Sequence, residues 1–223
     1  MEKASVKMKR IDFHTHTFFS DGDLLPAELV NRALTLEHEA IAITDHAGPS
    51  NLEQVLDKVK KVSSEINAEI RIIPGVELTH VPISLISDLA ARARKLGAEV
   101  VLVHGETIVE PVPPGTNLAA LKCDDVDILA HPGMLSEEEA RIASETGTYL
   151  EITSRDGHSL TNGRVARLST EFGAEMVINT DTHSPEDLIT KEEAKAIALG
   201  SGLEEDAVNR SLNDNPRRIL EGL

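Results

Sequence analysis

The alternation of short apolar runs with longer amphipathic segments constrains the fold of this chain more than any other feature of its sequence. Seven runs rich in aliphatic residues have the length of strands, and they cover residues 11–13, 40–44, 71–73, 100–103, 128–130, 149–152 and 176–178. Segments with helical periodicity lie at residues 26–37, 52–66, 83–96, 136–146 and 161–172. Because strands that alternate with helices form parallel sheets, the pattern predicts an α/β fold whose strands form a small barrel.

Signals at the ends of the expected helices support this division of the chain. Pro26 stands where the first turn of a helix tolerates proline, and Ser136 precedes Glu139 by the three residues of a capping box. No stretch has the composition of a linker between domains. We therefore expect a single domain over residues 1–223, with the helical segment from Lys191 onward closing the barrel.

The acidic composition argues against nucleic acid as a general partner. The chain has 38 Asp and Glu residues and 22 Lys and Arg residues, which gives a formal net charge of -16. Such a charge repels a phosphate backbone, and an aromatic content of 2% leaves few side chains on which bases can stack. A nucleic-acid-binding role is thus disfavoured.

The sequence also predicts where the protein resides. Its first ten residues are charged and lack the apolar core of a secretory signal, and no run of about 18 apolar residues follows. Cys123 is the only cysteine and cannot form an intrachain disulfide, which suits a reducing compartment. We expect a cytoplasmic protein that does not enter a membrane, and its oligomeric state stays open.

Histidine and carboxylate side chains follow the expected strands. Six of the nine histidines lie just after a strand, where chance would place about one. They are His14, His16, His46, His104, His131 and His183, and the carboxylates Asp45, Glu77, Glu151 and Asp181 lie at the same strand ends. In a barrel of parallel strands these ends meet at one mouth, which is where functional groups of such barrels gather.

Metal binding explains this gathering better than separate local roles do. Taken alone, His131 before Pro132 would open a turn, and Asp45 would form an Asx turn beside His46. Brought together without cations, however, the imidazoles and carboxylates would repel and desolvate one another. Divalent ions remove that penalty because neutral imidazole and carboxylate are their natural ligands.

Two pairs with i, i+2 spacing add a geometric argument. His14 and His16 are separated by one residue, and so are Asp181 and His183. In an extended strand such residues point to the same side, so both members of a pair can coordinate one ion.

These residues resemble the PHP (polymerase and histidinol phosphatase) superfamily of metal-dependent phosphoesterases, in particular its stand-alone histidinol-phosphatase-like members. The matching motifs are Asp12-Phe13-His14-Thr15-His16, Ser20-Asp21-Gly22, Thr44-Asp45-His46, Gly75-Val76-Glu77, Val103-His104-Gly105, Ala130-His131-Pro132 and Asp181-Thr182-His183. Together they extend over nearly the whole chain. The resemblance implies a distorted seven-stranded TIM-like barrel, (β/α)7, with a trinuclear metal site.

The resemblance also implies which residues hold the ions. His14, His16, Glu77 and Asp181 would hold the first ion, Glu77 would bridge to a second ion held by His104 and His131, and Asp21, His46 and His183 would hold the third. Some members have histidine where this chain has Asp21, so occupancy of the third position is the least constrained. Mixed nitrogen and oxygen ligands predict two or three divalent manganese, iron or zinc ions.

The expected activity is metal-dependent hydrolysis of a small phosphomonoester, as in histidinol phosphatases, by a hydroxide that bridges two ions. Arg155 is the candidate for binding phosphoryl oxygens, and Asp45 the candidate for orienting His46 or another ligand. His38, at the end of an expected helix, is predicted to lie on the surface.

Two other functions stay open. One is a nucleotide phosphoesterase or 3′-5′ exonuclease, which the net charge disfavours. The other is a catalytically silent metal-binding regulatory domain, against which the completeness of the ligand set argues.

Overall fold

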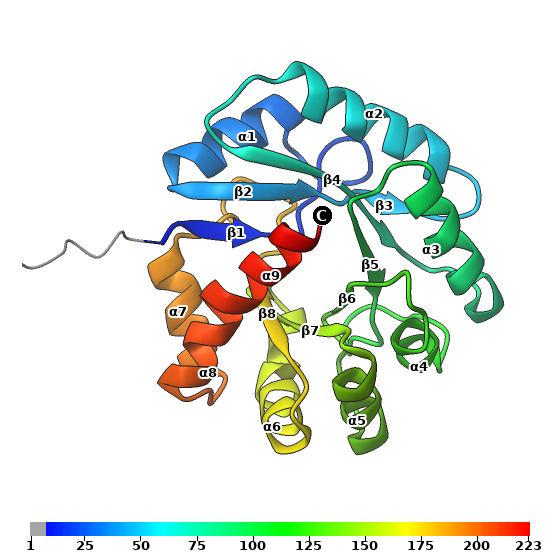
Figure 1. The fold of residues 1–223 in the computed structure, drawn as a ribbon, viewed down its shortest axis with the longest axis vertical. Coiled ribbons are helices and arrows are strands. Elements are labelled where there is room, and N and C mark those ends of the chain that lie inside the picture. The colour runs from blue at the N-terminus through cyan, green and yellow to red at the C-terminus, as the bar shows by residue number, and fades with distance from the viewer. Residues whose placement is uncertain (1–7) are drawn as a thin grey trace, which may run out of the picture.

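Seven parallel strands form a nearly closed barrel in the computed structural model, which describes residues 8–223 (Figure 1). The strands are β1 (Arg10–Asp12), β2 (His38–Ile43), β4 (Arg71–Leu78), β5 (Val100–His104), β6 (Ile128–Ala130), β7 (Tyr149–Thr153) and β8 (Met176–Asn179), in this order around the sheet. A two-residue strand, β3 (His46–Ala47), pairs with the end of β4. The predicted fold class is confirmed.

Helices connect the strands on the outside of the barrel (Figure 1). They are α1 (Pro26–Thr35), α2 (Leu52–Glu65), α3 (Ile86–Lys95), α4 (Thr116–Leu121), α5 (Glu137–Thr146) and α6 (Asn162–Phe172), followed by α7 (Lys191–Gly200), α8 (Glu205–Asn209) and α9 (Asn215–Gly222). Short helical turns are η1 (Ile83–Leu85), η2 (His158–Thr161) and η3 (Arg210–Asp214). The sequence pattern missed β3 and α4, both of which are too short to show a periodicity.

Alternating strand residues divide the core into an inner and an outer part. The inner cluster includes Phe13, Ala42, Leu102 and Val177, and it is joined at one end by Ile219 from α9. Two further clusters lie between the strands and the surrounding helices. In Figure 1 α9 crosses the end of the barrel that faces the viewer, so the C-terminal helices close the barrel as the sequence predicted.

One side chain and a few backbone contacts complete the seam between β8 and β1, where no regular ladder forms among the described residues. The backbone N–H of Phe13 donates to Asn179 Oδ1 at 3.0 Å, and that of His16 donates to the carbonyl of Thr182 at 2.8 Å. A single bridge joins Thr15 to Thr182. The seam therefore ties the loop after β1 directly to the loop after β8.

Gly75 allows β4 to change partners in the middle of the strand. Residues before it pair with β2, and residues from it onward pair with β5. A Cβ atom at Gly75 would lie 2.5 Å from Val100 Cγ1 and 2.8 Å from Thr44 Cγ2, which no side chain tolerates. The close approach brings the end of β4, and with it Glu77, against its neighbours.

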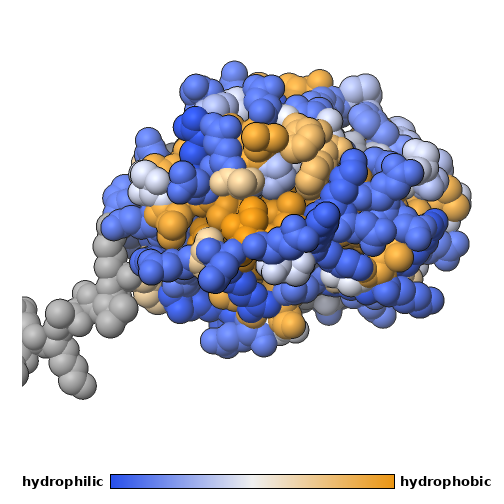
Figure 2. Space-filling model, turned by 90° about the horizontal axis from the view of Figure 1, so that it is seen from above, coloured by the Kyte–Doolittle hydropathy of each residue, from blue (hydrophilic) through white to orange (hydrophobic). Residues whose placement is uncertain are grey.

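The face of the molecule over α1 and α2 combines hydrophilic and hydrophobic residues. Figure 2, which looks onto the side formed by α1 and α2, shows hydrophilic residues around a central group of hydrophobic ones. Within residues 8–223 no helix combines the length and the apolar character that crossing a membrane requires.

Candidate metal centre

All nine predicted metal ligands meet at the mouth formed by the C-terminal ends of the strands. They fall into overlapping groups whose donor atoms lie within 4.8 Å of one another. The groups are His14, His16 and Glu77; His14, His131 and Asp181; Glu77, His104 and His131; and His16, Asp21, His46 and His183. The strand-end pattern, with Asp21 added by the resemblance to the PHP superfamily, therefore identified residues that the fold brings together.

The spacing of the inner donors suits ligands that share an ion. His14 Nε2 lies 3.4 Å from Glu77 Oε1 and 3.4 Å from Asp181 Oδ1, and His16 Nε2 lies 3.1 Å from Asp181 Oδ1. Two ligands held at about 2.1 Å from one ion are about 3.0 Å apart in octahedral and about 3.4 Å apart in tetrahedral geometry. The separations correspond to edges of such a coordination shell.

Several of these donor atoms are buried and have no hydrogen-bond partner within the described part of the chain. They are His14 Nε2, His16 Nε2, His131 Nε2, Glu77 Oε1 and Asp181 Oδ1. Leaving buried polar atoms unsatisfied is costly, and these five face the same centre. Divalent cations would satisfy all of them, so the residues present fit a metal site.

The outer group is open to solvent. Asp21 Oδ1 lies 3.4 Å from His46 Nε2 and 3.3 Å from His183 Nε2. The Asp21 side chain is 58% exposed, whereas those of His14, His16 and Glu77 are fully buried. A third ion would therefore be the one most accessible from outside.

Hydrogen bonds at Nδ1 turn three imidazoles so that Nε2 faces the other ligands. The Nδ1 atoms pair as follows: His14 with Glu151 at 2.8 Å, His46 with the Thr79 hydroxyl at 2.6 Å and His183 with the Asp181 carbonyl at 2.9 Å. Each acceptor fixes the proton on Nδ1 and leaves the Nε2 lone pair for a metal. His104 differs, because its Nδ1 pairs with the Gly105 carbonyl at 3.0 Å and its Nε2 pairs with Glu110 Oε2 at 3.0 Å.

A hollow of about 460 Å³ opens beside the outer group. Asp21 and His46 form one part of its wall, the 47–51 loop another, and Thr79, His80 and Glu110 the remainder. A substrate that reached the outer group would occupy this hollow.

Comparison with known proteins agrees with the motifs. The PHP domain model matches residues 12–112. Uncharacterized protein MJ1295 of Methanocaldococcus jannaschii is 51% identical over 215 residues, which cover 95% of this chain and 99% of that protein. The chain belongs to the PHP family. The predicted membership among the metal-dependent phosphoesterases is therefore confirmed.

Two further similarities concern a longer relative and a solved structure. DNA polymerase/3′-5′ exonuclease PolX of Bacillus subtilis is 27% identical over 196 residues, but this chain spans only 34% of its length. Histidinol phosphate phosphatase of Lactococcus lactis, solved with zinc, L-histidinol and phosphate, has a TM-score of 0.63 and 17% identity. That match covers 88% of this chain and 95% of the other, and it shows a shared fold.

Charges in the centre of this PHP protein are strongly coupled. Burial lowers the pKa of His14, but Glu151 and the other adjacent carboxylates outweigh burial and raise the pKa well above its ordinary value. Burial likewise opposes protonation of His46, yet Glu77 and Asp21 raise its pKa to about 10. Burial and then the charge of His46 lower the pKa of His16 to about 3. Without metal, protons on His14 and His46 balance the buried carboxylates.

Two of the predicted ligands have a left-handed backbone. His131 has φ of 26° and Asp181 has φ of 53°, a region that residues other than glycine seldom occupy. Such conformations cost about 1 kcal/mol or more and persist where surrounding contacts enforce them. The His131 N–H is held by Glu151 Oε2 at 3.0 Å, which is one such contact.

Glu151 forms hydrogen bonds to two of the predicted ligands, a role that the sequence did not reveal. It is fully buried, accepts from His14 Nδ1 and the His131 N–H, and also accepts from Asn179 Nδ2 at 2.9 Å. Its position at the end of the sixth predicted strand was the only signal. One carboxylate thus orients ligands from two strands.

Glu110 and His158 also lie at the centre and were given no role from the sequence. Glu110 Oε2 lies 3.0 Å from His104 Nε2, and Glu110 Oε1 lies 3.6 Å from His158 Nε2. The His158 ring is buried, with its centroid 4.2 Å from that of His131. Glu110 lies in the long loop between β5 and α4, and His158 begins η2 shortly after β7, so neither directly follows a strand as the predicted ligands do.

Asp45 organises a loop and makes no hydrogen bond to His46 among the described contacts. Its carboxylate accepts from the N–H and hydroxyl of Thr17 at 2.8 and 2.7 Å and from those of Ser20 at 3.1 and 2.7 Å. This loop leads directly to Asp21. By fixing this loop, Asp45 helps to position the backbone of Asp21.

Arg155 contacts the loop that carries His183. Its Nη1 donates to Asp187 Oδ2 at 2.7 Å, and the same oxygen accepts from the His183 N–H at 2.9 Å. The predicted contact of Arg155 with phosphoryl oxygens stays a prediction.

The surface placement of His38 is wrong. His38 begins β2 opposite Arg10 of β1 and is fully buried. Its Nδ1 pairs with the Ala33 carbonyl at 3.1 Å, and burial, with a smaller effect of Arg10, lowers its pKa to about 4. His38 follows a helix in the sequence, but in the fold it is the first residue of a strand inside the sheet, which is why it is buried.

Metal binding should release protons. At pH 7 the raised pKa values of His14 and His46 keep both imidazoles protonated in the metal-free protein, and a bound ion requires their neutral form. We expect release of at least about two protons per chain, because the pKa values of His104 and His183 are raised as well, and an apparent metal affinity that rises from pH 6 to pH 8. Titration calorimetry in buffers with different ionisation heats measures this release, and heats that do not depend on the buffer would contradict it.

Proposed function

We propose that this PHP protein hydrolyses small phosphomonoesters with two or three manganese, iron or zinc ions. The observation that carries the proposal is the set of five buried, unpartnered donor atoms that face one centre, beside an outer group open to a hollow. Ions bound there would lower the pKa of a water molecule and neutralise charge on a phosphoryl group.

The ligand assignment follows the observed groups. His14, His16, Glu77 and Asp181 would hold one ion, Glu77 with His104 and His131 a second, and Asp21, His46 and His183 a third. Glu77 lies between the first two groups because Oε1 is 3.4 Å from His14 Nε2 and 3.5 Å from His131 Nε2, while Oε2 is 3.6 Å from His16 Nε2. A carboxylate that faces ligands of both groups suits a bridge between two ions.

The charge of the residues that line the hollow favours a small substrate rather than a polynucleotide. Among the described residues that line it there is no Lys or Arg, while Asp21 and Glu110 contribute carboxylates. A nucleic-acid strand is held mainly by cations along its backbone, and none lines this approach. A compact phosphomonoester needs only its phosphoryl group to reach the ions.

Glu110 favours a substrate whose alcohol half is positively charged. It lies at the wall of the hollow and close to His104, so its carboxylate would attract an ammonium group on the leaving alcohol. Histidinol phosphate carries such a group and is our leading candidate. Arg155 would contact phosphoryl oxygens by sharing its guanidinium between them and Asp187.

A nuclease is the second candidate, because the similarity to PolX includes most of this chain. The net charge of -16 and the acidic hollow argue against it. The two functions differ in the substrate that turns over faster, so one assay distinguishes them.

Replacement of Glu77 tests the proposed bridge. Glu77→Gln keeps the size of the side chain but removes the charge that two ions would share. We expect loss of at least one ion per chain and a fall in kcat of at least about 100-fold, which corresponds to about 2.7 kcal/mol. Elemental analysis and steady-state kinetics measure both effects.

The matched control is Glu65→Gln on the exposed surface of α2, which should change neither quantity. If Glu77→Gln retained wild-type metal content and turnover, the bridging assignment would be wrong.

A substrate panel tests the ranking of activities. Phosphate release should be faster from at least one small phosphomonoester than nucleotide release from a single-stranded oligonucleotide, since only the polyanion is repelled along its length. The panel should pair ammonium-bearing with neutral phosphomonoesters. Faster turnover of the oligonucleotide than of every monoester would reverse the ranking.

A further inference from the structure

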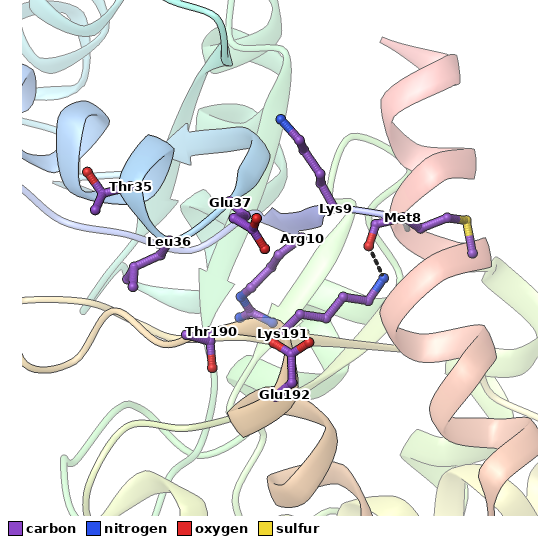
Figure 3. A pocket seen from close by; sticks show the side chains of 9 residues that line it. All are labelled: Met8, Lys9, Arg10, Thr35, Leu36, Glu37, Thr190, Lys191 and Glu192. Carbon is purple, nitrogen blue, oxygen red and sulfur yellow. Dashed lines mark hydrogen bonds between the residues drawn. The ribbon is translucent and has the colours of Figure 1, made fainter. Parts of the chain in front are cut away.

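Two hollows outside the proposed metal centre differ in what lines them. One, of about 280 Å³, lies between the start of β1, the end of α1 and the start of α7 (Figure 3). Arg10 in its wall donates to Asp12, and Lys191 donates to the Met8 carbonyl and to Asn213, so the protein itself occupies these cations. The other is a groove of about 390 Å³ between the start of α1 and the end of α2.

The groove between α1 and α2 is lined mainly by apolar side chains. Phe19 and Leu25 lie on one side of it, and Val62 and Ile66 lie on the other. Phe18, whose ring centroid is 4.8 Å from that of Phe19, is 52% exposed, and Leu25 is 57% exposed. Figure 2 shows a hydrophobic group at the centre of the face that these two helices form. Neighbouring apolar side chains with a charged rim are typical of a surface that a partner covers.

Three charged side chains of α2 form the rim of the groove, and they are Lys58, Lys61 and Glu65. With Val62 they have the spacing i, i+3, i+4 and i+7, which places all four on one face of the helix. Lys61 and Glu65 are 71% and 66% exposed, and their atoms approach only to 3.9 Å. Lys58 Nζ lies 5.2 Å from the centroid of the Phe19 ring and has no carboxylate partner within residues 8–223. The charges of this rim are therefore available to a partner.

The order of these charges is self-complementary. If two copies of α2 pack antiparallel about a two-fold axis beside Val62, Lys58 of each copy lies opposite Glu65 of the other. The two residues are two helical turns apart, about 10 Å along the axis, so both pairs form at the same time. A two-fold axis brings the same surface of both chains together, and each contact then occurs twice.

The apolar residues fit the same arrangement. The two grooves would face each other between the charged pairs, which removes Leu25, Val62 and Ile66 of both copies from water. Lys61 lies near the axis, where its aliphatic stem can cover apolar surface while its ammonium group stays in solvent beside Glu65.

Local charge also favours a second copy at this place. The net charge of -16 opposes contact between most surfaces of two identical chains. The rim of the groove, by contrast, carries two lysines and one glutamate. We infer that two copies of the chain associate through this groove, about a two-fold axis that pairs Lys58 of each copy with Glu65 of the other.

Charge reversal tests the inference. Lys58→Glu and Glu65→Lys each replace two attractive contacts between the copies by two repulsive ones. In sedimentation equilibrium we expect the wild-type protein to form a dimer with a Kd of about 100 µM or tighter. Each single variant should associate at least tenfold more weakly.

Mixing the two variants provides the decisive comparison. In an equal mixture one chain carries two acidic and the other two basic side chains at the paired positions, so a heterodimer should form although neither variant associates with itself. The double variant Lys58→Glu/Glu65→Lys should regain self-association for the same reason. Lys122→Glu at the exposed end of α4 changes the net charge by the same amount as Lys58→Glu and should leave the Kd unchanged.

The inference fails if the wild-type protein stays monomeric at concentrations well above the expected Kd. It also fails if both single variants keep the wild-type Kd, which would place a dimer interface elsewhere, or if their mixture associates no more than its components. None of these outcomes depends on metal content or phosphatase activity, so the test is independent of the proposed function.

Discussion

The mutual repulsion and desolvation of two buried carboxylates is the constraint around which the mouth of this barrel is organised. Glu77 and Asp181 are almost completely shielded from water, yet both remain ionised because imidazoles surround them. Protons on His14 and His46 can supply the compensating charge, and so can divalent ions. Only ions also satisfy the unpartnered Nε2 atoms, so we regard the metal-loaded state as the one for which the site is built.

The rest of the fold holds these groups at short range. Glu151 orients His14 and the backbone of His131, while Asp45 fixes the loop that carries Asp21. The left-handed backbone at His131 shows that the surrounding contacts override local preference. Such support keeps ligand positions defined before any ion arrives, which reduces the reorganisation that metal binding requires.

Much of this arrangement could be predicted because the periodicity of apolar residues and the spacing of histidines and carboxylates can be read directly from the sequence. The aliphatic runs marked the strands, and parallel strands necessarily bring their ends to one mouth, so His14 and Glu77 could be placed together. The role of Glu110 could not be predicted, because a long loop determines where it lies. His38 was misplaced for a related reason: its neighbours in sequence are helical, whereas its neighbour across the sheet is Arg10.

We expect the converging imidazoles and carboxylates to hold divalent ions. Anomalous diffraction from crystals of the metal-loaded protein, recorded at the absorption edge of the added metal, would locate these ions. Two or three peaks should appear at the mouth, with the innermost surrounded by His14 Nε2, His16 Nε2, Glu77 and Asp181. Saturated crystals with no peak among these four residues, or with peaks only elsewhere on the molecule, would contradict this expectation.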